Sequence, residues 1–210
     1  MMVEITKGDY NMIDFGTKSN TSAGILNLEK EEILDLTKSG SALKHLILGA
    51  GWDVPKIGAS YDLDIAAFLL HENRRIREAG KDVVYFRQKQ QQGISLDKDN
   101  RTGAGEGDDE RIQIDTEALD PTVSSIVFVV TIYEAEKKGQ VFGKVKNAYV
   151  RLLDADDNER VLCQFPLTDA ASTDTAVIFC ELFRSGDGWE FKAIGESCQG
   201  DLNDLLSRYM

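Results

Sequence analysis

The chain has 210 residues, a length that fits one domain with a single sizeable core. Its 36 Asp and Glu against 24 Lys and Arg give a net charge of −12, so phosphate backbones and anionic membranes repel it. The longest apolar stretch, 126–132, is interrupted by Thr131, so the sequence contains no bilayer-spanning segment. We therefore expect a globular protein that binds no nucleic acid and does not insert directly into a membrane.

The start of the chain has no basic segment followed by an apolar stretch, so we expect no secretory signal and a cytoplasmic location. Residues 1–24 are predicted to form a separate arm and residues 25–210 the folded domain. Cys163, Cys180 and Cys198 are odd in number and far apart, which fits neither a disulfide framework nor a zinc site. We expect reduced thiols in the core.

From residue 25 onward, short apolar segments alternate with turn-forming residues, which is typical of an all-β protein. Eleven short strands predict a two-sheet β-sandwich. The run from Ile126 to Val130 shows no alternation, so we expect it to be buried on both faces in the middle of a sheet. The predicted strands are 25–28, 33–36, 43–48, 63–70, 82–86, 111–115, 125–133, 147–153, 160–165, 176–183 and 189–194.

Only a few short helices are expected, the clearest near the C-terminus. Over 201–209, Asp201 can cap a helix on which Leu202, Leu205 and Leu206 share one face. The charged segment 71–80 lacks clear periodicity and is predicted to be an exposed turn or frayed helix.

One acidic segment, 97–110, combines six carboxylates, an amide and three alternate glycines in fourteen positions. Calcium takes about six to eight oxygen ligands, from carboxylates and backbone carbonyls, and glycines let the backbone turn its carbonyls inward. Crowded carboxylates repel one another, and a divalent cation removes that conflict. The segment therefore indicates a calcium site, against the alternative of a solvated surface run.

A second acidic pair, Asp62 and Asp64, opens the predicted strand 63–70. Residues two apart on a strand share a face, so both carboxylates project together while Leu63 and Ile65 point to the other side. Such charges on a strand favour pairing or metal binding, and we expect this pair to meet the acidic segment.

Other readings of these residues fit less well. An EF-hand starting at Asp97 would place Arg101 at the fifth position and glycine at the seventh instead of the sixth. A dinucleotide loop at 103–107 has its third glycine misplaced and no surrounding βαβ unit. For catalysis, His45 and His71 lie near no Gly-x-Ser-x-Gly or cysteine motif, so both are predicted to be structural and the protein is expected not to be an enzyme.

Several motifs in fixed order resemble the tellurite-resistance TerD family of bacterial stress proteins. The similarity extends over residues 25–210. The motifs that carry it are Gly51-Trp52-Asp53, Asp62-Leu63-Asp64, Asp99-Asn100-Arg101-Thr102-Gly103, Gly107-Asp108-Asp109-Glu110, Phe142-Gly143, Glu181-Leu182 and Trp189-Glu190-Phe191.

This resemblance implies a β-sandwich that binds calcium, commonly two Ca2+ ions, and acts in stress response beside other proteins of a tellurite-resistance or stress complex. It also implies a cytoplasmic protein that reaches the inner membrane only through partners. The predicted metal ligands are Asp62, Asp64, Asp99, Asn100, Thr102, Gly103, Glu106, Asp108, Asp109 and Glu110.

Three functional hypotheses follow. In the first, Ca2+ orders the acidic segment to make a rigid surface for protein partners. In the second, the domain is a metal-free structural or interaction module, because Ala104 and Glu106 depart from the family's usual loop. The third, a metal-dependent hydrolase, lacks a supporting His, Ser or Cys. Magnesium prefers tight octahedral geometry and zinc prefers His and Cys, so calcium is the favoured ion.

Overall fold

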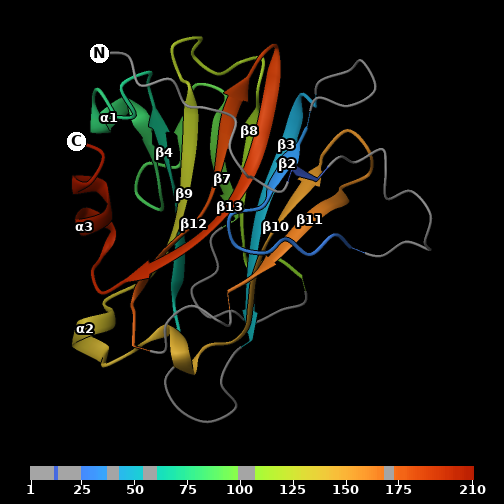
Figure 1. Cartoon of the computed structure of the whole chain (residues 1–210). Helices are drawn as coiled ribbons and strands as arrows, with labels where there is room; N and C mark the ends of the chain where they lie inside the picture. The colour runs from blue at the N-terminus through green and yellow to red at the C-terminus, as the bar shows by residue number, and fades with distance from the viewer. Residues whose placement is uncertain (1–11, 14–24, 37–42, 54–60, 99–106, 168–172) are drawn as a thin grey trace.

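Two stacked β-sheets form the body of the protein in a computed structural model (Figure 1). The structure describes residues 12–13, 25–36, 43–53, 61–98, 107–167 and 173–210. Within these ranges, every named strand pair is antiparallel except β1–β2. The predicted two-sheet β-sandwich is therefore confirmed.

The two sheets have seven and six strands in the described ranges. The seven-stranded sheet has the order β1 (Met12–Ile13), β2 (Ile33–Asp35), β13 (Gly188–Cys198), β12 (Ala176–Ser185), β9 (Ser125–Ile132), β4 (Leu63–Leu70) and β5 (Val83–Val84). The six-stranded sheet has the order β11 (Arg160–Pro166), β10 (Lys146–Asp154), β3 (His45–Asp53), β8 (Glu110–Asp115), β7 (Ile94–Lys98) and β6 (Gln90–Gln91).

Apolar side chains from both sheets fill the space between them. Leu48 of the six-stranded sheet and Ile65 and Phe128 of the seven-stranded sheet belong to this main core, each 0% exposed. Burial of apolar surface on this scale is the main stabilising term for the sandwich.

A second apolar cluster lies on the outer face of the seven-stranded sheet. It combines Phe68 of β4 and Val127 of β9 with Leu205 of helix α3 (Leu202–Ser207). This helix runs beside β4 and β9 in Figure 1. The cluster covers the second face of β9, so all eight residues of this strand are buried. This confirms the prediction of a central strand that is buried on both faces.

Helix α3 begins as the sequence predicts. The Asp201 carboxylate accepts hydrogen bonds from the backbone N–H groups of Asn203 and Asp204, at 2.7 and 3.1 Å. The Asp204 carboxylate accepts in return from the Asp201 N–H at 2.8 Å, which completes a capping box. The other helices are short: α1 (Ala79–Asp82), α2 (Ala135–Lys138) and a 3-10 turn at Phe142–Lys144.

Several predicted boundaries are wrong. The expected strand 25–28 is only an isolated bridge between Asn27 and Gln164. Within the expected strand 82–86, only Val83–Val84 is strand. Strand β3 runs on to Asp53, whereas the predicted strand ends at residue 48. Strands β6 and β7 were not predicted, although Ile94 and Leu96 of β7 alternate into the core.

The predicted N-terminal arm contributes Met12–Ile13 to the sheet as β1, which pairs in parallel with β2. The predicted free thiols agree with the structure: Cys163 and Cys180 are buried and Cys198 is partly buried.

Candidate functional site: a carboxylate edge of the sandwich

The start of β8 lies against the start of β4, so the two acidic clusters of the sequence meet at one edge of the sandwich. We call Asp62, Asp64, Asp109 and Glu110 the carboxylate edge. The contact that joins its two halves is a hydrogen bond from the Ile65 N–H to Glu110 Oε2, at 2.6 Å.

Glu110 connects the two sheets. Its side chain is 0% exposed, although it belongs to an edge that is rich in charge. Strand β5 pairs with β4 only at Ala67 and Phe68, so at Ile65 the carboxylate takes the place of a partner strand's carbonyl. A carboxylate that accepts from a backbone N–H makes a strong charge-assisted hydrogen bond. Glu110 therefore fixes β4 relative to β8.

Asp109 holds the end of β3 against the start of β8 in a similar way. Its side chain is 3% exposed, and Oδ2 accepts a hydrogen bond from the Trp52 N–H at 3.0 Å. Its own N–H donates to the Ala50 carbonyl at 2.8 Å. The end of β3 and the start of β8 are thus held together by side chain and backbone.

Asp64 lies on the opposite face of β4 from Ile65. Leu63 and Ile65 belong to the core between the sheets, while Ala66 belongs to the outer cluster, so the predicted alternation is confirmed. Asp64 is 7% exposed and pairs in register with Thr131. It lines a cavity of about 890 Å3 that extends toward α2 and the start of α3.

Asp62 precedes the strand and is partly buried. Its carbonyl accepts a hydrogen bond from the Tyr133 N–H at 2.8 Å, which continues the pairing of β4 with β9 by one step.

Asp108 is engaged on the outer face of the six-stranded sheet. Its Oδ1 accepts hydrogen bonds from Arg151 Nε at 2.7 Å and from the Tyr149 hydroxyl at 3.2 Å. The carboxylate lies over Gly49, where an added Cβ would come within 2.3 Å of Oδ2. Burial and the negative charge of Asp108 raise the pKa of Tyr149 to about 12. Asp108 therefore has a basic partner already, and its predicted role as a metal ligand stays a prediction.

The remaining predicted ligands, Asp99, Asn100, Thr102, Gly103 and Glu106, lie outside the described residues. Within the described ranges, no group of three or more Asp, Glu, His and Cys side chains could hold a metal ion. The carboxylate edge alone is therefore not a closed ion site.

Sequence reasoning missed the groups that partner these carboxylates. Arg151 and Tyr149 of β10 were not predicted, yet both contact Asp108. Their alternation on β10 opposite Gly49 and Gly51 of β3 was a readable signal, because glycines in a strand mark a close approach of neighbouring groups. The backbone partners of Glu110 and Asp109 could not be found this way.

The two histidines have definite partners. The exposed His45 ring lies 2.8 Å from Asp156 Oδ1, and this carboxylate raises the pKa of His45. His71 is buried, and its Nδ1 lies 2.9 Å from the Thr122 carbonyl.

Among the helices of the described residues, none has the length and apolar character that a membrane span requires.

These features define a class: a two-sheet β-sandwich in which a buried carboxylate, Glu110, links the two sheets at one edge. Residues 25–209 match the TerD domain family, and the chain belongs to that family.

Named relatives share most of their length with this chain. It is 38% identical over 186 residues to the tellurium resistance protein TerD of an Alcaligenes species, covering 88% of this chain and 96% of that protein. It is 36% identical over 188 residues to general stress protein 16U of Bacillus subtilis, with 88% and 96% covered.

A crystal structure of a TerD homologue from Streptomyces coelicolor has the same fold, with a TM-score of 0.66. It covers 79% of this chain and 96% of that chain at 24% identity.

Proposed function

We propose that this protein is a non-catalytic, calcium-binding member of the tellurium-resistance and stress-response group, in which Ca2+ orders the acidic segment for contact with protein partners. The observation that carries the proposal is the buried position of Glu110 and Asp109, which tie β4 and β3 to the strand that follows the acidic segment. An ion held there would act directly on the joint between the two sheets.

The chemistry of the donor set fits calcium. The carboxylate edge offers oxygen ligands only, without a His or Cys, and hard cations with adaptable shells prefer such donors. Asp62, Asp64, Asp109 and Glu110 would hold the ion together with the predicted loop ligands. Bound Ca2+ supplies positive charge that offsets repulsion among carboxylates in a chain of net charge −12.

The names of the relatives support a role in stress response. One is a tellurium resistance protein and another a general stress protein, and both align with nearly their whole length. We propose the same role here, with other proteins of a tellurite-resistance or stress complex as partners and a cytoplasmic location peripheral to the inner membrane through those partners.

One observation favours the second candidate, a metal-free interaction module. Glu110 and Asp109 accept backbone hydrogen bonds, and Asp108 pairs with Arg151, so protein groups alone satisfy part of the acidic cluster. In that case the sandwich would fold and bind its partner equally well in chelator.

Thermal unfolding in EDTA and in CaCl2 distinguishes the two candidates. If Ca2+ binds only the folded state, a hundredfold excess over Kd adds about 2.7 kcal/mol to the free energy of unfolding. Asp64→Asn should reduce this gain, whereas Asp187→Asn, at an exposed hairpin turn, should leave it intact. A melting temperature indifferent to Ca2+ overturns the calcium proposal and leaves the metal-free module.

A further inference from the structure

A second cavity lies at the opposite end of β4 from the carboxylate edge. It has a volume of about 420 Å3 and takes most of its lining from two connections: 71–82, between β4 and β5, and 116–124, between β8 and β9. Leu69 and Val123, both buried, give it apolar walls. Small-molecule sites have volumes of about 300–1,000 Å3 and combine apolar walls with a few polar groups, so this cavity is large enough for a small ligand.

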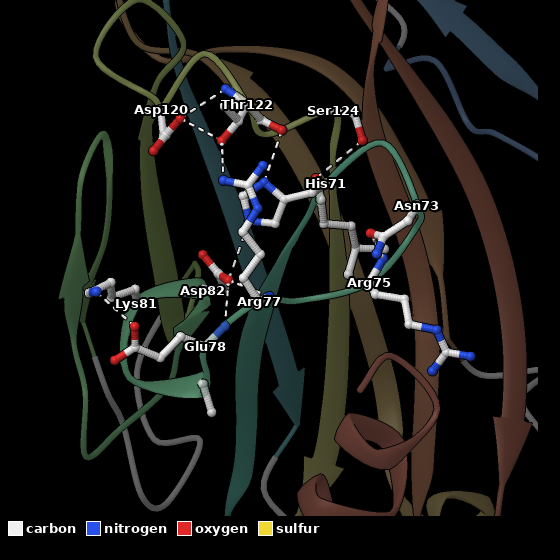
Figure 2. Close-up of polar contacts among 12 residues, drawn as sticks. His71, Asn73, Arg75, Arg77, Glu78, Lys81, Asp82, Asp120, Thr122 and Ser124 are labelled. Atoms are coloured by element: carbon white, nitrogen blue, oxygen red, sulfur yellow. Dashed lines mark hydrogen bonds and ion pairs between the residues drawn. The ribbon is translucent and has the colours of Figure 1, made fainter.

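His71 brings a ring nitrogen without a partner to this cavity. Its side chain is 6% exposed, and Figure 2 shows it between Thr122 and Asp82. Nδ1 lies 2.9 Å from the Thr122 carbonyl oxygen, which can only accept, so Nδ1 carries the proton. Nε2 then has the lone pair of the imidazole. Among the described residues, this nitrogen has no hydrogen-bond partner.

The group that Nε2 approaches is the carboxylate of Asp82, which is another acceptor. Nε2 and Asp82 Oδ2 lie 3.3 Å apart, within ion-pair distance but without the geometry of a hydrogen bond. Oδ2 already accepts hydrogen bonds from the Arg77 N–H at 2.7 Å and from the Glu78 N–H at 3.0 Å (Figure 2). The lone pair of Nε2 and a carboxylate therefore lie side by side, and a bound donor would satisfy both.

The charges that line the cavity favour a positively charged ligand. The lining includes the carboxylates of Glu78, Asp82 and Asp120 and the cations of Arg77 and Lys81. Lys81 and Glu78 neutralise each other at 2.7 Å. Two carboxylates then remain against one cation, and the Arg77 guanidinium is already hydrogen-bonded to a threonine hydroxyl at 3.0 Å.

An organic cation fits these groups better than a metal ion does. Within the described ranges, no group of three or more Asp, Glu, His and Cys side chains could hold a metal ion. A primary ammonium carries three N–H donors and no acceptor, so it can donate to a ring nitrogen and to a carboxylate at the same time. A short alkyl chain on that ammonium matches the apolar walls.

We propose that this cavity binds a small primary alkylammonium compound, whose N–H groups donate to His71 Nε2 and to the Asp82 carboxylate while its alkyl chain lies against Leu69 and Val123. The bound ammonium supplies the donor that Nε2 lacks and reduces the repulsion between the two acceptors. This site is independent of the proposed calcium function, because it shares no residue with the carboxylate edge.

The test follows His71 by nitrogen NMR at one neutral pH while butylammonium is added. His45 is the only other histidine, so His45→Gln leaves His71 as the sole imidazole and is the background for all measurements. In the free protein, Nε2 should show the shift of an unprotonated nitrogen. Butylammonium should move this shift upfield with a Kd of about 1 mM. Butyltrimethylammonium has the same charge but no N–H donor, so it should bind at least about tenfold more weakly.

Three further changes in this background locate the site. Asp82→Asn removes the charge but keeps an oxygen that can accept the two backbone N–H groups, and it should weaken butylammonium binding about tenfold. Lys81→Gln removes a cation from the lining, so binding should stay equal or become tighter. Asp187→Asn, at an exposed hairpin turn, is the control and should leave the affinity unchanged.

Several results overturn the proposal without requiring any variant of the cavity to fold. A ring that is protonated on both nitrogens in the free protein has no lone pair to offer a ligand. An Nε2 shift that stays constant up to about 0.1 M butylammonium, far above the expected Kd, shows that the amine does not reach the ring. Equal affinities for the two ammonium ions show that hydrogen bonding does not select the ligand. Weaker binding in Lys81→Gln also contradicts a site for cations.

Discussion

Replacement of Glu110 by alanine is the most direct perturbation of the joint between the sheets. The change removes the carboxylate that accepts the Ile65 N–H at 2.6 Å, and both residues are 0% exposed. Both groups are closed to solvent in the unmodified protein, so the N–H would lose its acceptor in a buried environment. We therefore expect Glu110→Ala to destabilise the protein in EDTA, before any contribution from calcium.

The magnitude follows from two contributions with an opposing one. A buried N–H left without an acceptor costs about 1–3 kcal/mol. The lost side-chain methylene removes about 0.8 kcal/mol of apolar burial. Removal of one buried negative charge offsets part of this total, so the expected net loss is about 2 kcal/mol. For a chain of this length that corresponds to a melting temperature lower by about 4–8 °C.

Urea unfolding monitored by tryptophan fluorescence in EDTA measures the effect. Glu117→Ala is the matched control, because this glutamate is 62% exposed and pairs with Lys44 at the surface. Such an ion pair contributes about 0–1 kcal/mol. If Glu110→Ala is no less stable than the control, Glu110 does not join β4 to β8 and the account of the edge is wrong.

Three further predictions concern the outer face of the six-stranded sheet and the core. Gly49→Ala should displace the Asp108 carboxylate and lower stability by about 1–3 kcal/mol in chemical unfolding. Gly80→Ala is the control, because its added Cβ would meet its nearest neighbour at 3.7 Å, and it should leave stability nearly unchanged. Equal losses of stability in the two variants would contradict the close packing over Gly49. Tyr149 should ionise near pH 12 in an ultraviolet titration of the folded protein. Because unfolded tyrosine ionises near pH 10, the free energy of unfolding should fall as the pH rises from about 10 to about 12. Ionisation near pH 10 in the folded protein would refute the burial of Tyr149 beside Asp108. Burial raises the pKa of the Cys163 thiol to about 12, so this thiol should not react with a thiol reagent until the protein unfolds. Mass spectrometry locates the modified cysteine, and modification of Cys163 in the folded protein would show that reagent enters the core.

Strands β4 and β9 of the seven-stranded sheet could be predicted because their sequence signal is local. Strand β4 has the bounds expected from its apolar run, 63–70, and β9 is buried along its whole length as the lack of alternation indicates. Helix α3 follows from Asp201 and the spacing of its leucines, because a capping box is a short-range device.

Weaker elements were missed for physical reasons. Strand β7 alternates Ile94 and Leu96, but a short strand beside a polar glutamine tract gives a faint signal. The residues of β3 beyond Leu48 are mainly glycines and a tryptophan, whose strand state depends on pairing with β8 and β10.

The sequence also predicts one part of the candidate site and not the other. The sequence indicates which residues carry oxygen donors, and the alternation along β4 places Asp64 and Ile65 on opposite faces. It cannot indicate that Glu110 bonds to a backbone N–H 45 residues away, or that Asp108 faces Arg151. Such contacts depend on the register of strands that are distant in sequence.

The most direct test of the proposed function is isothermal titration of EDTA-stripped protein with CaCl2 and, separately, with MgCl2. Selective binding of Ca2+ should weaken in both Asp64→Asn and Asp109→Asn, because the proposed site takes one ligand from β4 and another from the segment that leads into β8. Heat of dilution alone, from the unmodified protein, would contradict it and show that the carboxylate edge is a structural joint that needs no ion.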